Sequence, residues 1–188
     1  MKKVLYAFLI FQALIFSTNA FSQGIYLKVQ LTGYEFNGGA TVIGYQNQVE
    51  VGSFSDGISG CVVAGTKACV SATAGINFMT IITRATIDFK SVQLQNKIIT
   101  SADLAWVKMT GAGVFEYYKI HMEDVRVTSV QESASSGGDA PVVSVALQPA
   151  RIAWKVITQN AAGNPGPSSS YGWDFKTNAA FNYNFPAL

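Results

Sequence analysis

The stretch Phe115-Glu-Tyr-Tyr-Lys-Ile-His-Met-Glu-Asp-Val-Arg-Val-Thr-Ser129 decides how the rest of the chain is interpreted. Apolar residues occupy alternate positions up to Met122 and again from Val125, but the two series are out of step. Alternation with a period of two is typical of a strand with one buried face. A bulge near Glu123 and Asp124 would produce the shift. The stretch therefore predicts one long strand with a bulge in its middle.

Other extended segments lie on both sides of this strand. The apolar residues from Gly24 to Leu31 alternate cleanly, and Gly111-Ala-Gly113 predicts a hairpin turn ahead of the long strand. Further strands are expected at 42–54, 76–83, 102–110, 142–157 (interrupted at Pro149) and 171–178. The segment 85–99 has an amphipathic pattern that predicts the single helix. Six or more strands and one helix predict a mainly β fold, either a sandwich or a barrel.

The N-terminus has the three parts of a secretory signal peptide. Met1-Lys2-Lys3 supplies positive charge, an apolar run extends to Phe16, and small or polar residues continue to Ala20. The run is shorter than the roughly 20 residues that a spanning helix needs, so no permanent membrane anchor is expected. Cleavage after Ala20 and cleavage after Ser22 both fit, and a buried N-terminal helix is the alternative interpretation. An exported protein, secreted or periplasmic, is expected.

Without residues 1–22, the chain has one domain's length, residues 23–188. Loss of Lys2 and Lys3 lowers the number of basic residues from 13 to 11, equal to the 11 acidic residues. The remaining basic residues are scattered, so nucleic acid is not expected as a partner. Only 13% of the residues are charged, which suits an extracellular β protein or one that hides surface in an oligomer.

Both cysteines lie in a long segment, 55–75, that is expected to be irregular because it is rich in Gly, Ser, Ala and Thr. Loops of this length are usually functional or disordered. In an exported chain, Cys61 and Cys69 are expected to form a disulfide, which would favour an ordered loop. Two free thiols and a metal site are the alternatives, although no histidine lies nearby to complete a set of zinc ligands. The segments 131–141 and 163–170 are also expected to be loops.

No catalytic residue, metal site or cofactor is assigned from the sequence. His121 is the only histidine, and its alternate neighbours Lys119 and Glu123 predict a surface or interface position. The adjacent Glu123 and Asp124 are interpreted as a bulge or turn feature rather than an acid–base pair. Six aromatic residues are expected to pack in the core or between subunits, with an exposed sugar-binding platform as the alternative: Trp106, Trp154, Trp173, Tyr117, Tyr118 and Tyr171.

Three segments resemble the haemolysin-coregulated protein (Hcp) family, which forms the tube of bacterial type VI secretion. The stretch 115–129 is similar to that family's tyrosine-containing strand. Val143-Ser-Val-Ala-Leu-Gln-Pro-Ala-Arg-Ile-Ala-Trp154 resembles its late strand. Tyr171-Gly-Trp-Asp-Phe-Lys-Thr-Asn178 resembles its C-terminal tyrosine-glycine-tryptophan strand, with Tyr171, Gly172, Trp173 and Asp174 as the signature. The likeness covers nearly all of residues 23–188.

The resemblance implies a two-sheet closed β-barrel with one flanking α-helix, assembled six to a ring, with rings able to stack. It implies no catalytic residues and no cofactor. Its partners would be copies of itself and secreted effector or spike proteins. The family's long loop contributes to stacking, which implies a role here for Ser53, Phe54, Asp56, Gly57, Gly60 and Gly75.

The signal peptide sets this chain apart from tube subunits of the family, which carry none. The expected function is therefore that of an exported, non-enzymatic ring protein that acts structurally or as a carrier in secretion. A monomeric secreted binding module for glycan or protein is the alternative, and a secreted effector on the same scaffold is a third possibility.

Overall fold

The computed structural model describes residues 23–60, 72–110, 113–137, 140–160 and 164–186. The segment expected to be a signal peptide and the expected disulfide between Cys61 and Cys69 lie outside these ranges. The elements in chain order are β1 (Gln23–Leu31), β2 (Tyr34–Glu35), β3 (Val49–Glu50), β4 (Ser53–Ser59), β5 (Ala72–Ile81), α2 (Arg84–Leu94), β6 (Ile99–Thr110), β7 (Gly113–Ser133), β8 (Val142–Gln148), β9 (Arg151–Gln159), β10 (Pro165–Asp174) and β11 (Ala179–Ala180).

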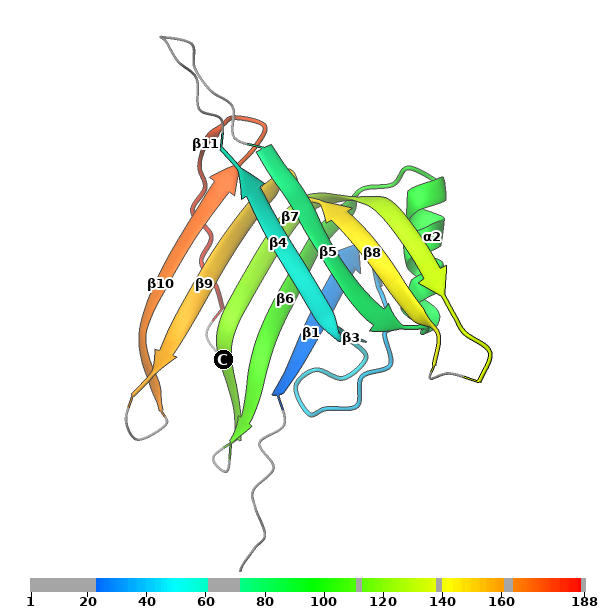
Figure 1. The fold of residues 1–188 in the computed structure, drawn as a ribbon. Coiled ribbons are helices and arrows are strands. Elements are labelled where there is room, and N and C mark those ends of the chain that lie inside the picture. The colour runs from blue at the N-terminus through cyan, green and yellow to red at the C-terminus, as the bar shows by residue number, and fades with distance from the viewer. Residues whose placement is uncertain (1–22, 61–71, 111–112, 138–139, 161–163, 187–188) are drawn as a thin grey trace, which may run out of the picture.

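The strands form two sheets that share β7 (Figure 1). Sheet A has the order β11-β10-β9-β7-β6-β1, with β2 and β3 pairing to β1. Sheet B has the order β7-β8-β5-β4. All the pairings are antiparallel. A strand that belongs to two sheets must bend where it passes from one to the other. In β7 the bend lies where the alternation of apolar residues shifts.

The bend in β7 is at Asp124, which has a left-handed backbone with φ 51°. Pairing with β9 ends at Glu123, and pairing with β8 begins at Arg126. The predicted change of side at this point is therefore present. It is a corner between two sheets rather than a bulge, because the register of β6 against β7 is the same on either side of it. The bulges of β7 fall elsewhere, at Tyr117 and Thr128.

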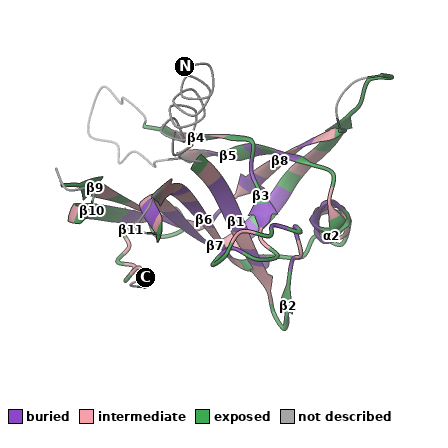
Figure 2. Cartoon of the chain, turned by 90° about the horizontal axis from the view of Figure 1, so that it is seen from below, coloured by how far each residue is buried: buried purple, intermediate pink, exposed green. Residues whose placement is uncertain are grey.

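The core lies between the sheets and is closed by the helix (Figure 2). Phe89 of α2 contacts Phe36 and Phe78 in edge-on geometry, at ring-centre distances of 5.0 and 5.6 Å. The helix begins after Thr83, whose backbone N–H donates to Thr86 Oγ1 at 3.1 Å, while Thr86 N donates to Thr83 O. The helix is shorter at its C-terminal end than the predicted 85–99, because Gln95 and Asn96 end it in a turn and Ile99 starts β6.

A mainly β fold of two sheets with one flanking helix is confirmed. The strand ladders alone do not form a closed ring. Two main-chain hydrogen bonds bridge the sheets instead, since Val51 N donates to Ile25 O of β1 and Gly52 N donates to Met79 O of β5, both at 2.8 Å. β4 on one side and β9 with β10 on the other extend beyond this bridged barrel (Figure 1).

Three predicted segments differ from the structure. The expected strand 42–54 is mostly turns, with only Val49–Glu50 paired before β4 begins. The expected irregular segment 55–75 contributes most of β4 and the start of β5, which pair with each other. The expected loop 163–170 belongs largely to β10. The segments 55–75 and 163–170 are rich in Ser, Gly and Thr and show no apolar alternation. Their strands therefore depend on main-chain pairing with a neighbouring strand.

Candidate functional site

The outward side of sheet A carries a dense set of ionisable residues, which we call the covered face. Cross-strand pairing places Lys28, Asp103 and His121 in one row, and Gln30, Ser101 and Glu123 in the next. The acidic and basic side chains on this face include Lys28, Glu35, Glu50, Asp103, Glu116, Lys119, His121, Glu123, Arg151, Lys155 and Asp174. Two segments of the chain itself lie over it, the loop 36–48 and the segment Phe181–Pro186.

We call Phe181–Pro186 the strap. Its aromatic residues Phe181, Tyr183 and Phe185 are half-buried, while Asn182 and Asn184 between them are exposed. The main chain is attached to β10 at its start, where Phe181 N donates to Gly172 O at 2.9 Å. The strap is thus an extended segment that turns every second side chain toward sheet A.

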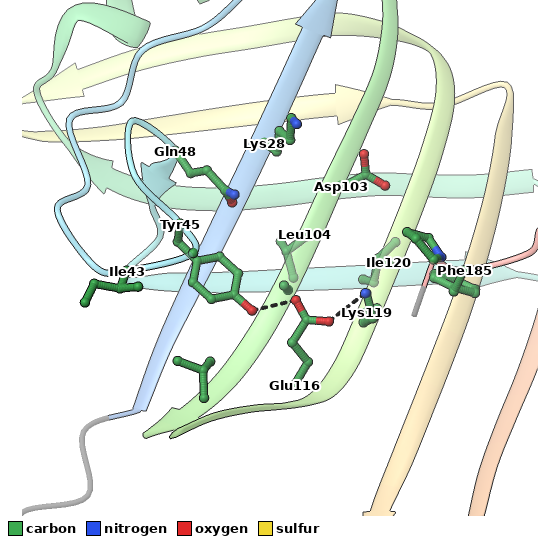
Figure 3. Close-up of a pocket in the computed structure, with 14 residues that line it drawn as sticks. Lys28, Ile43, Tyr45, Gln48, Asp103, Leu104, Glu116, Lys119, Ile120 and Phe185 are labelled. Atoms are coloured by element: carbon green, nitrogen blue, oxygen red, sulfur yellow. Dashed lines mark hydrogen bonds and ion pairs between the residues drawn. The ribbon is translucent and has the colours of Figure 1, made fainter. Parts of the chain in front are cut away.

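Between the loop and the strap lies a pocket of about 320 Å³ (Figure 3). In it the Tyr45 hydroxyl donates to Glu116 Oε1 at 2.5 Å, and the Lys119 ammonium lies 2.6 Å from Glu116 Oε2. Glu116 is only 5% exposed. Burial, followed by the hydrogen bond and the charge of Glu116, raises the pKa of Tyr45 far above its ordinary value. Tyr45 therefore stays a hydrogen-bond donor throughout the ordinary pH range.

His121 lies under the strap and is 5% exposed. The prediction of a surface position is therefore wrong, because the aromatic residues of the strap cover a row that cross-strand parity alone assigns to solvent. Its Nδ1 is 2.6 Å from Asp103 Oδ1, and its Nε2 is 3.2 Å from Glu123 Oε1. The Tyr183 ring stacks on the imidazole at a centre distance of 3.6 Å.

The carboxylates at the corner of β7 are held in ion pairs. Glu123 lies 2.9 Å from Arg151, and Asp124 lies 2.8 Å from the Lys176 ammonium. The hydrogen bond from Lys176 holds the pKa of Asp124 below its usual range. Among the described residues, no group of three His, Cys, Asp or Glu is arranged to hold a metal ion. The adjacent carboxylates serve the corner, as the sequence interpretation expected.

The outward side of sheet B is different, and we call it the uncharged face. Cross-strand pairing aligns Ser53, Met79, Ser144 and Gln131 in one row across four strands. The adjacent rows add Ser55, Asn77, Ala146 and Ser129 on one side and Ile81, Val142 and Ser133 on the other. None of these residues is ionisable, and Met79 and Ile81 are 45% and 53% exposed.

The residues assigned to ring stacking lie on β4, β5 and the start of the connection between them. Phe54 points inward and packs edge-on against Trp106 at 5.5 Å. Asp56 accepts a hydrogen bond from Trp154 Nε1 at 2.6 Å, which links β4 to β9. Ser53 and Gly60 are exposed, and Gly57 pairs with Gly75. Two of the six residues thus have structural roles, and the stacking role stays a prediction.

The signature residues hold the turn that leads into the strap. Asp174 accepts hydrogen bonds from Lys176 N and Thr177 N, at 2.7 and 3.0 Å. Gly172 allows close approach, since a Cβ there would lie 2.4 Å from Phe181 O. Tyr171 is exposed and stacks on Trp173 at 6.4 Å. The tyrosine-glycine-tryptophan pattern is therefore explained by the return of the chain.

The aromatic residues do not form an exposed row. Trp106, Trp154 and Tyr118 are partly buried and pack against the core. Tyr117 lies 5.6 Å from Trp106, and Tyr171 alone of the six is exposed. This arrangement favours the packing interpretation over a sugar-binding platform.

Sequence reasoning missed both the strap and the uncharged face. The strap has a signal, the alternation Phe181-Asn-Tyr-Asn-Phe185, but it follows the last expected strand and was not interpreted. The uncharged face has none, because its rows bring together residues from four separate strands.

The comparisons with known proteins agree on one family. Residues 26–156 match the family model described as type VI secretion system effector, Hcp. The chain is similar to a solved structure described as a type six secretion system protein, with 20% identity and a TM-score of 0.75, covering 85% of this chain and 100% of that one. It is also similar to Hcp1 from Salmonella typhimurium, with 24% identity and a TM-score of 0.66, covering 85% and 99%.

Hcp2 from Salmonella typhimurium is a third similar structure, with 22% identity, a TM-score of 0.61, and coverage of 83% of this chain and 98% of that one. At these identities the likeness shows the fold. The comparison with curated proteins found no match. No helix within the described residues has the length and apolar character needed to cross a membrane.

Proposed function

Since this chain belongs to the type VI secretion system Hcp family, we propose that it is an exported structural protein that self-assembles into hexameric rings. The family is one of secreted, oligomerising tube proteins that are generally non-enzymatic. The leader at residues 1–22 would send this member to the periplasm or out of the cell. There it would act structurally or as a carrier for effector or spike proteins.

The uncharged face is the observation that carries the self-assembly part of the proposal. Its central rows span four strands without one ionisable side chain, and Met79 and Ile81 are exposed on it. Two copies can approach such a surface without like-charge repulsion and without stripping water from charged groups. The occupant we propose is a second copy of this chain, because identical chains usually satisfy such surfaces in closed symmetric assemblies.

The free edge of β4 supports the same proposal. Among the described strands β4 pairs with β5 alone, so no described strand adjoins its other edge. An unpaired edge is a template for a further strand unless it is covered. The exposed Ile58 on β4, 57% exposed, adds apolar area beside this edge. We expect the ring contacts to involve this part of sheet B.

The connection between β4 and β5 is where we propose the stacking contacts between rings. Ser59 and Gly60 lead into it and are exposed. A disulfide between Cys61 and Cys69 would restrict the connection in the oxidising compartment to which the leader directs the chain. Its presence is checked by mass spectrometry of the exported protein before and after reduction.

The test of the ring is the mass of the mature protein, residues 23–188, measured by size-exclusion chromatography with light scattering. We expect six times the subunit mass at high concentration. Met79→Asp places six negative charges on the uncharged faces, and we expect it to weaken association by about tenfold or more. A wild-type protein that stays monomeric at high concentration would overturn the ring and favour the monomeric binding module.

The matched control is Ile43→Asp. Ile43 is 82% exposed and lies at the rim of the pocket on the covered face, away from sheet B. The substitution adds the same charge to the same number of subunits, so we expect no loss of association. Equal weakening by both variants would mean that added charge, rather than the uncharged face, controls assembly.

A further inference from the structure

The hydrogen bonds of His121 define its protonation state. One ring nitrogen lies 2.6 Å from a carboxylate oxygen of Asp103, and the other lies 3.2 Å from a carboxylate oxygen of Glu123. A carboxylate only accepts, and an imidazole donates from both nitrogens only when it is protonated. While both carboxyl groups are ionised, the two contacts can be satisfied together only by the imidazolium form.

Each inward aromatic ring of the strap lies against a basic side chain of sheet A. Phe181 lies under the Arg151 guanidinium at 5.3 Å, and Phe185 lies under the Lys155 ammonium at 5.9 Å. Between them, Tyr183 stacks on His121 at 3.6 Å with an angle of 5° between the rings. Cations over aromatic rings attract them, more strongly where water is excluded. The strap is thus held by a row of three cation–aromatic contacts.

Of these three cations, only the histidine loses its charge near neutral pH. Arginine and lysine side chains in general keep their positive charge well above neutral pH. The middle contact is also the shortest and most buried. Loss of one proton therefore removes both the central cation and one of the two histidine hydrogen bonds.

We propose that the strap is a proton-controlled latch over the covered face, closed while His121 is protonated and released when His121 loses its proton. Release would expose Phe181, Tyr183 and Phe185 together with the carboxylates beneath them. The inference concerns this chain's own C-terminal segment and does not depend on ring formation.

The charged groups around His121 determine the sign of the effect. Asp103 on β6 and Glu123 on β7 face it directly, and Glu123 is shared with Arg151 of β9. Other titratable groups around the strap include Lys28, Lys119, Lys155, Asp174 on β10, the Asp124–Lys176 pair and the Tyr183 hydroxyl. Lys119 is engaged by Glu116, and Lys28 lies 3.6 Å from Glu35. Asp103 and Glu123 are therefore the charges nearest the ring, and Glu123 also forms an ion pair with Arg151.

Burial alone would lower the pKa of His121, but the hydrogen bonds and charges of Asp103 and Glu123 outweigh it, so the pKa is raised above 6.5. A group whose pKa is raised by folding contributes its full stabilisation below the unfolded pKa. That contribution is lost as the pH rises through the folded pKa. The latch is therefore closed below the folded pKa of His121 and weakens as the pH rises through that pKa.

The experiment starts from the single histidine of the chain, whose imidazole protons give one set of NMR signals in protein lacking residues 1–22. We expect a titration midpoint above that of a free histidine peptide. In parallel, chymotrypsin cleavage after Phe181 and Tyr183 is followed by mass spectrometry and normalised to a free peptide of the strap sequence at each pH. The normalised rate should rise by about threefold to thirtyfold across the histidine titration, the range of one lost cation–aromatic contact.

Three variants separate the latch from general unfolding. Asp103→Asn should move both the histidine midpoint and the rise in cleavage to lower pH. In His121→Gln, the normalised rate of cleavage of the strap should not depend on pH. This holds over the pH range in which carboxyl groups are ionised and tyrosines are not. Tyr183→Leu should speed cleavage after Phe181 and move the histidine signals, whereas Tyr171→Leu, on the exposed signature tyrosine, should do neither.

Two results would overturn the latch. One is a normalised cleavage rate that stays constant while the histidine titrates. The other is a pH response that persists unchanged in His121→Gln.

Discussion

The outward sides of the two sheets differ in charge and in cover, although β7 belongs to both. The covered face of sheet A is rich in acidic and basic side chains and is overlaid by the loop 36–48 and the strap. The uncharged face of sheet B has none in its central rows, and no described segment overlies it. Buried charges stabilise a fold only when they are paired, and those of sheet A are paired with one another.

This difference shows which outer face has its charges paired and its apolar residues covered by the chain itself. On sheet A, the chain supplies the partner of each buried charge, as Tyr45 and Lys119 do for Glu116. On sheet B, Met79 and Ile81 face outward without a covering segment. We therefore expect substitutions on the covered face to change the stability of the subunit, and those on the uncharged face to change its association.

The largest effect is expected from Glu116→Ala. It leaves the Lys119 ammonium, whose side chain is 15% exposed, and the buried Tyr45 hydroxyl without their shared partner. Breaking a buried ion pair from one side costs about 3 kcal/mol in the free energy of unfolding. Urea denaturation followed by circular dichroism measures the loss.

The control is Glu132→Ala, on the part of β7 that belongs to sheet B. Glu132 pairs with Lys90 at 2.7 Å, but both side chains are more than a third exposed. An exposed pair contributes about 0.5 kcal/mol or less. Similar losses in the two variants would contradict the distinction between a covered and an open side.

A smaller effect is expected from Gly172→Ala. Its new Cβ would lie 2.4 Å from Phe181 O and 3.1 Å from the Ala153 side chain, so the start of the strap must shift. Overpacking of this kind costs about 1–3 kcal/mol, and strap cleavage by chymotrypsin should become faster. Gly60→Ala, at a position with open space, should change neither quantity. An unchanged strap in Gly172→Ala would show that the close approach is not required.

The smallest effect is expected at the corner of β7, from Lys176→Ala. The Lys176 hydrogen bond lowers the pKa of Asp124, so this contribution is present above an unfolded pKa of about 3.9 and is lost as the pH falls through the folded value. Because both groups are partly exposed, we expect a change of about 0.5 kcal/mol at pH 7. Thermal unfolding at pH 7 and below pH 3 measures it.

The sign of that pH dependence is opposite to that of the strap. The corner pair loses its contribution in acid, whereas the histidine contact loses its contribution as the solution becomes alkaline. A difference between wild type and Lys176→Ala that grows as the pH falls would contradict the assignment of this pair.

Local patterns in the sequence were sufficient for the elements that alternate. The apolar series of β1, β6 and β7 predicted strands, and the shift at Glu123 and Asp124 located the bend. Alternation is a property of neighbouring residues, so it can be recognised without knowing the partners of a strand. Most of β4 and the first part of β10, residues 165–170, were not predicted, because these Ser- and Gly-rich segments show no such pattern.

The surfaces were less predictable than the strands. Parity placed His121 on the outer side of its strand correctly, yet the side chain is buried because Tyr183 returns to cover it. The predicted stacking residues Phe54 and Asp56 proved to be tied into the fold through Trp106 and Trp154. In each case a residue distant in sequence decided the environment.

The sequence by itself determined the strand periodicity, the place of α2 and the resemblance to one family, because each depends on the order of nearby residues. Tertiary structure alone decided which outer face is covered and which is left open. That outcome depends on cross-strand register and on the return of the strap over sheet A, and register brings together residues that are far apart along the chain.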